Sequence, residues 1–300
     1  MFKKVLLTLL TTLSLFANAE QKTIQAIVTI APGGGLDLSV RHFEKYLAEK
    51  KNINLVLIHK PGAESLIGSR DIANSPKDGS VIGFNTIGLL ASVLEKNKNL
   101  DFELISATRK YAAVMVASQK TNITDYDDFV SKARSGTDFK FAQGSANQKI
   151  QVDYLISVVK PKIDPVVASY KGAGPVINDL LGGHIDIAII PYAIVKDHIA
   201  SKKLKLIATT SKLVDHPNST VLTKLYPNFV DYGGYCLILP KNTDPAIVSF
   251  WKTTVEEYLN DPKMKEEFVK EASEPYPFGE KFLKDIIHEY QRKFPTGVNN

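Results

Sequence analysis

The feature that most constrains the fold is a repeated alternation of short apolar runs with amphipathic segments, joined by glycine-rich turns. The run 24–30 is mostly apolar and β-branched, and a proline with three glycines at 32–35 leads from it into 36–47, where apolar side chains recur at helical spacing. Runs at 54–58 and 81–84 are likewise followed by helical patterns. Strands that alternate with helices form a parallel sheet with helices on its faces, so this part of the chain is predicted to be an α/β unit.

A second series of the same kind follows a strand predicted at 111–118. Its predicted strands are 139–142, 166–170, 185–190 and 204–209. Glycine turns join the first two of them to helices, as in the first series. Both halves of the chain therefore contain strand–glycine–helix units. We predict two α/β lobes, with 111–118 and 234–240 as the segments that cross between them.

The N-terminus has the pattern of a cleaved secretory signal. A basic start at 1–4 precedes the apolar run 5–16, and Ala17-Asn18-Ala19 has the small-x-small pattern that signal peptidase cuts. The apolar run is too short to cross a hydrocarbon core of ~30 Å. We predict cleavage after Ala19 and export of the mature chain to the periplasm.

The charge balance excludes one class of partner. The chain has 37 basic and 32 acidic residues, a net charge of +5. Removal of Lys3 and Lys4 with the signal leaves 35 basic residues against 32 acidic ones, which is +3. This surplus is small and forms no long basic tract, so no nucleic-acid partner is predicted.

No motif of catalysis or metal binding is present in the sequence. The chain contains neither G-x-S-x-G nor H-E-x-x-H. Its six histidines stand singly, at positions 42, 59, 184, 198, 216 and 288. Cys236 lies within an apolar run, where a buried small hydrophobe is expected. We therefore predict a protein that is not an enzyme and that uses no metal and no cofactor.

The glycine turns offer a different chemistry. Glycines directly before a helix expose backbone N–H groups, and the helix dipole adds positive potential, which suits a carboxylate or phosphate oxygen. The turns at 33–35, 143–146 and 170–175 have this arrangement. Taken alone, the run 33–35 is equally compatible with a tight strand-to-helix turn. Several such loops could converge on one cleft between the lobes.

An ordered set of motifs carries a family resemblance from Ile27 to about Phe250. The set comprises Pro32-Gly33-Gly34-Gly35-Leu36-Asp37 with Arg41, Pro61-Gly62-Ala63 with Ile67-Gly68, Asp78-Gly79, Tyr170-Lys171-Gly172, the segment 175–186, the segment 204–210 and Leu239-Pro240. In this order they resemble the tripartite tricarboxylate transporter receptors, the Bug-type periplasmic solute-binding proteins.

The resemblance implies a two-lobed periplasmic binding protein fold of type II-like architecture, with two crossover strands and a ligand cleft between the lobes. The C-terminal helices would return to the first lobe, which gives 20–117 plus 239–300 as lobe 1 and 118–238 as lobe 2, after the signal at 1–19. The ligand would be a small organic acid, a mono- or dicarboxylate, handed to a membrane permease with large and small subunits. The receptor itself is expected to be a monomer.

The family's motifs also imply which residues form the site, because ligand carboxylates are held there largely by backbone amides, hydroxyls and ordered water. The first lobe would contribute Gly33, Gly34, Gly35, Asp37, Gly62, Ala63, Asn85 and Thr86, and the second lobe Gln143, Gly144, Ser145, Ala146, Tyr170 and Gly172. Asp37 would organise its loop more than touch the ligand.

The sequence departs from the family pattern around this cleft. Glu64-Ser65 stands where two small glycines are usual, and Ile190 stands where an acidic residue is common. The identity of the acid is therefore open. Two other functions share the scaffold: a sensor that presents the solute to a membrane histidine kinase, and an exported hydrolase or lyase.

Overall fold

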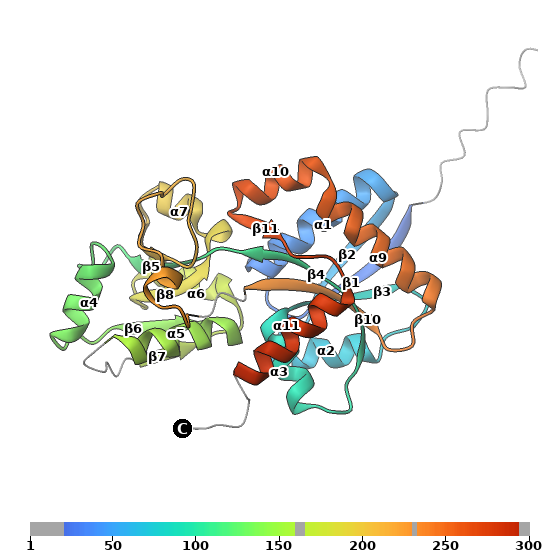
Figure 1. Ribbon diagram of the computed structural model, residues 1–300, viewed down its shortest axis with the longest axis horizontal. Coiled ribbons are helices and arrows are strands. Elements are labelled where there is room, and N and C mark those ends of the chain that lie inside the picture. The colour runs from blue at the N-terminus through green and yellow to red at the C-terminus, as the bar shows by residue number, and fades with distance from the viewer. Residues whose placement is uncertain (1–20, 160–165, 230–232, 294–300) are drawn as a thin grey trace, which may run out of the picture.

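The computed structural model describes residues 21–159, 166–229 and 233–293, so the predicted signal at 1–19 lies outside the described residues. The described chain forms two β-sheets, and each sheet carries helices on both faces. Figure 1 shows them as two lobes side by side, one coloured green to yellow and the other blue, cyan, orange and red. The predicted two-lobed α/β fold is confirmed.

The first sheet has six strands in the order β11-β4-β10-β3-β1-β2. Their bounds are β1 Lys22–Val28, β2 Ile53–His59, β3 Val81–Thr86, β4 Phe102–Tyr111, β10 Gly234–Pro240 and β11 Ser273–Pro275. The strands β1, β2 and β3 are parallel, whereas β10 runs antiparallel to β3 and β4. The carboxyl ends of β1, β2 and β3 consequently meet at one edge of the sheet.

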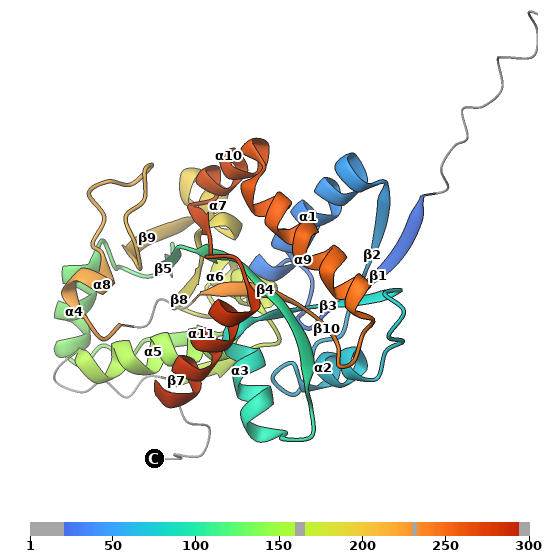
Figure 2. The same cartoon turned by 45° about the vertical axis from the view of Figure 1, so that its right-hand side comes forward.

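Two layers of helices cover this sheet. Its helices are α1 Gly35–Lys51, α2 Leu66–Ala73, α3 Ile87–Lys96, α9 Pro245–Asn260, α10 Pro262–Lys270 and α11 Glu280–Lys293. Both views show α1, α9 and α10 on one face and α2, α3 and α11 on the other (Figures 1 and 2). Aromatic rings fill the first layer, where Phe43 packs against Trp251 and Tyr258. The C-terminal helices thus lie on the first sheet.

The second sheet has five strands in the order β7-β6-β8-β5-β9. Their bounds are β5 Ala113–Ser118, β6 Lys140–Gln143, β7 Val166–Ser169, β8 Ile187–Pro191 and β9 Leu204–Thr209. The helical elements of this part are α4 Tyr126–Arg134, α5 Ala146–Val158, α6 Ala173–Gly182, the 3-10 turn η1 Tyr192–Ile194, α7 Lys196–Ala200 and α8 Leu222–Leu225. Here β6, β7 and β8 are parallel, so β6 and β7 end at the same edge.

The chain changes sheet at two places, one inside the predicted crossing segment 111–118 and the other ahead of the predicted crossing segment 234–240. Residues of β5 pair with β8 and β9 along its length, and β10 pairs with β3 and β4. Each strand therefore belongs to one sheet, and the changes fall at Ala112 and between β9 and β10. We propose lobe boundaries at these two points instead of 117/118 and 238/239. The strand β4 is an addition to the predicted elements.

Candidate ligand-binding site

The loop after β2 brings a strained turn to the edge of the first sheet. Gly62 has a φ of 130°, and the next three residues, Ala63, Glu64 and Ser65, have φ values of 46°, 51° and 68°. A left-handed conformation costs a non-glycine residue roughly 1–2 kcal/mol. Such conformations persist only where the surroundings hold them, and they concentrate at ligand-binding sites. The helix α2 begins directly after this turn.

A buried amide holds the turn from behind. Asn85, at the end of β3, is fully buried and accepts a hydrogen bond from the Thr29 hydroxyl at 2.9 Å. Its Nδ2 donates to the hydroxyls of Ser65 at 3.1 Å and Ser69 at 3.2 Å. Asn85 therefore ties the end of β1 to the strained turn and to α2. Thr86, the next residue, caps α3 by accepting a hydrogen bond from the Leu89 backbone N–H.

The second lobe presents the ends of β6 and β7. Gln143 donates from Nε2 to the Ser169 hydroxyl at 2.8 Å, which joins the two strand ends. Ser145 is the N-cap of α5, and its hydroxyl accepts from the Gln148 backbone N–H at 3.3 Å. This helix places the positive end of its dipole beside Ser145, where a negative group is favoured.

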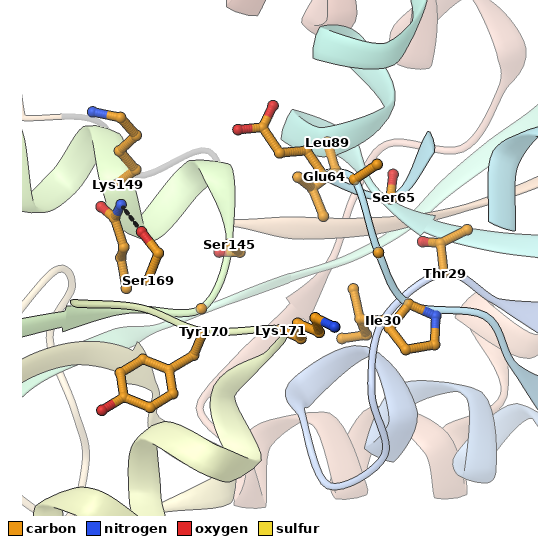
Figure 3. A pocket seen from close by; sticks show the side chains of 15 residues that line it. Thr29, Ile30, Glu64, Ser65, Leu89, Ser145, Lys149, Ser169, Tyr170 and Lys171 are labelled. Atoms are coloured by element: carbon orange, nitrogen blue, oxygen red, sulfur yellow. Dashed lines mark hydrogen bonds between the residues drawn. The ribbon is translucent and has the colours of Figure 1, made fainter. Parts of the chain in front are cut away.

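A cavity of about 140 Å³ lies between these two sets of loops. Its first-lobe lining is Thr29, Ile30, Pro61, Gly62, Ala63, Glu64, Ser65 and Leu89, and its second-lobe lining is Gln143, Gly144, Ser145, Lys149, Ser169, Tyr170 and Lys171. Figure 3 shows the two walls facing each other, with Lys171 between them and the Tyr170 ring turned away. The Tyr170 hydroxyl donates to Asp179, and burial together with this carboxylate raises the pKa of Tyr170 to about 12.

The triple-glycine turn has a different position from the one predicted. None of Gly33, Gly34 and Gly35 lines the cavity. A Cβ at Gly34 would lie 3.9 Å from the Ala173 backbone N, and one at Gly174 would lie 3.1 Å from the Pro32 carbonyl oxygen. The turn therefore packs against the start of α6, and backbone meets backbone across the two lobes.

Asp37 is buried and organises the triple-glycine turn. Its carboxylate accepts from the Gly33 N–H at 3.0 Å and lies 2.8 Å from His59 Nε2 and 3.3 Å from Arg41 Nε. Burial, the largest single effect, raises the pKa of Asp37, but the hydrogen bonds from Gly33, His59 and Arg41 and the Arg41 charge together hold that pKa below its ordinary value. The carboxylate is thus paired within its own lobe, and Asp37 is not among the residues that line the cavity.

Apart from Asp37, described above, and Ala146, the predicted site residues fall into three groups. The cavity is lined by Gly62, Ala63, Gln143, Gly144, Ser145 and Tyr170. Asn85 and Thr86 lie behind the lining, where they hold it. Gly33, Gly34, Gly35 and Gly172 lie at the contact between the lobes. Ala146 is the first residue of α5, and its side chain is outside the described part of the structure.

Sequence reasoning missed several lining residues. Thr29 and Ile30 directly follow β1, Ser169 ends β7, and Lys171 lies between the predicted site residues Tyr170 and Gly172. The sequence did contain one signal, because Glu64-Ser65 interrupts the family pattern beside Gly62 and Ala63. Lys149 could have been predicted as a lining residue because it lies one turn into the helix that Ser145 caps.

A metal site would require a group of His, Cys, Asp or Glu side chains among the described residues. Among residues 21–159, 166–229 and 233–293, no group of three or more His, Cys, Asp and Glu residues could hold a metal ion. Cys236 is fully buried, and burial raises the pKa of its thiol to about 12. No helix in the described part of the chain is long and apolar enough to span a membrane.

The fold and the cavity are those of a two-lobed solute-binding protein, with loops at strand ends of both lobes lining the cavity between them. The family model described as tripartite tricarboxylate transporter family receptor matches residues 40–295, and the chain belongs to that family. The predicted family is confirmed. Since the family consists of receptors, the prediction of a binding protein instead of an enzyme is confirmed as well.

Individual proteins of known sequence or structure are also similar to this chain. Protein BugT of Bordetella pertussis is 26% identical over 267 residues, which cover 85% of this chain and 81% of BugT. The structure of the periplasmic binding protein BugD superposes with a TM-score of 0.81 at 21% identity, covering 91% of this chain and 95% of BugD. The structure of MatC from Rhodopseudomonas palustris with bound malate has a TM-score of 0.79 at 19% identity, covering 91% and 97%.

Proposed function

We propose that this protein is an exported periplasmic receptor that captures a small organic acid between its lobes and delivers it to a tripartite tricarboxylate-type transporter. The observation that carries the proposal is the cavity of about 140 Å³, where the strained turn of the first lobe faces Ser145, Ser169 and Lys171 of the second. These side chains supply hydroxyl donors and a cation, which are the partners that a carboxylate requires.

The position of the site between the lobes supports capture by closure. The first lobe touches the second at the triple-glycine turn, and Lys196 in the second lobe donates to the Lys270 carbonyl oxygen at 3.4 Å in the first. A ligand in the cavity would contact both walls at once. Binding energy would therefore be available to favour the closed arrangement over an open one.

The relatives supply the chemical class of the ligand. One structure from R. palustris contains adipate, and it has a TM-score of 0.82 at 18% identity, covering 91% of this chain and 94% of that chain. MatC contains malate. We extend a carboxylic-acid ligand to this chain because its own cavity presents donors and an ammonium group. The family description supports a tripartite tricarboxylate-type transporter as the partner, and large and small permease subunits are part of the proposal.

The cellular location is part of the same proposal. We infer that the signal peptide is cut after Ala19, so that the mature receptor begins at Glu20. N-terminal sequencing of the protein from a periplasmic extract would find Glu20 first. A chain that retains Met1 in the cytoplasmic fraction would contradict the proposed export.

Native mass spectrometry of freshly purified mature protein tests the ligand class without prior choice of a ligand. We expect a fraction of the protein to retain a small compound that is released on denaturation and that carries a carboxylic acid group. A retained compound without any acidic group would overturn the proposed class. A control spectrum of the denatured protein gives the mass of the ligand-free chain.

A further inference from the structure

Three charged residues line the cavity, and their pairing differs. Glu64 on the first lobe forms an ion pair with Lys96 at 2.9 Å, and Lys149 on the second lobe is paired with Asp153. Lys171 makes no hydrogen bond or ion pair with any residue that the structure describes. Lys171 is therefore an exposed lining cation that no carboxylate of the described chain neutralises, and it is free to pair with a bound anion.

The hydroxyl groups of the second lobe favour an anion on the same side. The hydroxyls of Ser145 and Ser169 both accept hydrogen bonds within the lobe, from the Gln148 backbone and from Gln143. A hydroxyl that accepts one bond still has its own proton to donate. Lys171, Ser145 and Ser169 all line the cavity from the second lobe, and in Figure 3 the Lys171 side chain extends from that wall toward Ile30.

The first-lobe wall has the opposite character. Ile30, Pro61, Ala63 and Leu89 give it an apolar surface. The Thr29 hydroxyl donates its hydrogen bond to Asn85 Oδ1 and so has no proton left to donate to a ligand. Ser65 retains a proton to donate, but a second carboxylate there would lie beside the neighbouring carboxylate of Glu64, and like charges disfavour each other.

We propose that the ligand is a short monocarboxylate with an apolar chain, held with its carboxylate toward Lys171 and its chain against Ile30 and Leu89. This inference rests on the proposed function and narrows its ligand class. A single unpaired ammonium in a partly closed cavity is balanced by one negative charge, and burial of a second unbalanced charge is costly. Lys171 and Glu64 are then the residues that select a monoanion over a dianion.

A matched pair of acids tests the selection. Pentanoate and glutarate have the same number of carbons and differ in the second carboxylate. Isothermal titration at low ionic strength should give an affinity for pentanoate about tenfold or more above that for glutarate, which corresponds to about 1.4 kcal/mol. Raising the salt concentration should weaken pentanoate binding, since the carboxylate pairs with a partly exposed ammonium.

Substitutions at Lys171 test which group is responsible. Lys171→Met should weaken pentanoate binding about tenfold and remove most of its salt dependence, whereas Lys171→Arg, which keeps the charge, should retain the preference for pentanoate. Lys203→Met is the matched control, because Lys203 is an exposed lysine of the same lobe that does not line the cavity. It lowers the net charge equally and should leave both affinities as they are. Thermal unfolding of each variant verifies the fold.

The outcomes separate the two proposals. Glutarate binding as tightly as pentanoate, or pentanoate binding that survives Lys171→Met unchanged, would overturn the monocarboxylate inference and leave the acid receptor standing. Heat from none of a panel of mono- and dicarboxylic acids would overturn the proposed function, and the monocarboxylate inference with it.

Discussion

Replacement of Asn85 by leucine removes the amide that holds the first-lobe wall of the cavity. The side chain is fully buried and makes hydrogen bonds to Thr29, Ser65 and Ser69, whose own side chains are also buried. Leucine has the same branching at Cγ and offers no polar atom. Asn85→Leu therefore removes these bonds without opening a large hole, and it leaves buried hydroxyls to find other partners.

The expected loss in the free energy of unfolding follows from the number of hydrogen bonds removed. A buried hydrogen bond contributes about 1 kcal/mol net, so three bonds make about 3 kcal/mol, and any hydroxyl left unpaired adds to that figure. For a folding unit of this size, a loss of about 3 kcal/mol corresponds to a fall in Tm of roughly 6–12 °C. Because Asn85 also fixes Ser65 in its left-handed conformation, the affinity for the acid should fall as well.

Urea unfolding followed by circular dichroism measures the effect, with Ser69→Ala as the matched control. Ser69→Ala removes one of the bonds and should cost about 1 kcal/mol. If Asn85→Leu costs no more than Ser69→Ala and binds the acid as wild type does, the assignment of Asn85 as the support of the wall is refuted.

The remaining predictions concern three other sites. Gly144→Ala should lower stability by about 1–3 kcal/mol, because a Cβ there would lie 2.5 Å from the Gly172 carbonyl oxygen, and chemical unfolding measures the loss. Asp37 has a lowered pKa in the fold, so its stabilising charge is present above the ordinary aspartate pKa of about 3.9 and is lost as the pH falls through the lowered value. Asp37→Asn should therefore cost stability at pH 7 and progressively less at pH 3, and an equal cost at both values would contradict the pairing of Asp37. Cys236 should resist a thiol reagent at pH 8 in the native protein and react after unfolding; rapid native reaction would contradict its burial.

The sequence predicts those elements whose signal is local. The strand at 204–209 has the predicted bounds, since a short apolar run between turns needs no distant partner to identify it. The strand β4 was missed because charged residues, Arg109 among them, interrupt its apolar pattern. The buried Arg109 forms an ion pair with Glu271, 162 residues further along the chain, and hydrogen bonds with Ser39 and Ser273. A pairing at that distance leaves no mark in the local pattern.

The candidate site also combines features with a local sequence signal and features that depend on distant segments. Glycine turns mark strand ends, so Gly62 and Gly144 could be placed near a ligand from the sequence. The triple-glycine turn has the same local pattern, yet it packs against the start of α6, because the approach of the two lobes decides which turn borders the cavity. The sequence could not identify Lys171 as an unpaired lysine of the cavity either, because the pairing of a lysine depends on neighbours from other segments of the chain.

The most direct test of the central claim is isothermal titration of the mature protein with a carboxylic-acid panel, run in parallel on Ser169→Trp. Ser169 is an exposed residue of the cavity wall, so an indole there fills the space between the lobes with little disturbance to the core. The account predicts micromolar-range binding of at least one acid to the wild-type protein and no heat with the variant, whose thermal unfolding stays cooperative. Equal affinity of both proteins for that acid would show that the ligand binds elsewhere and would contradict the assigned cavity.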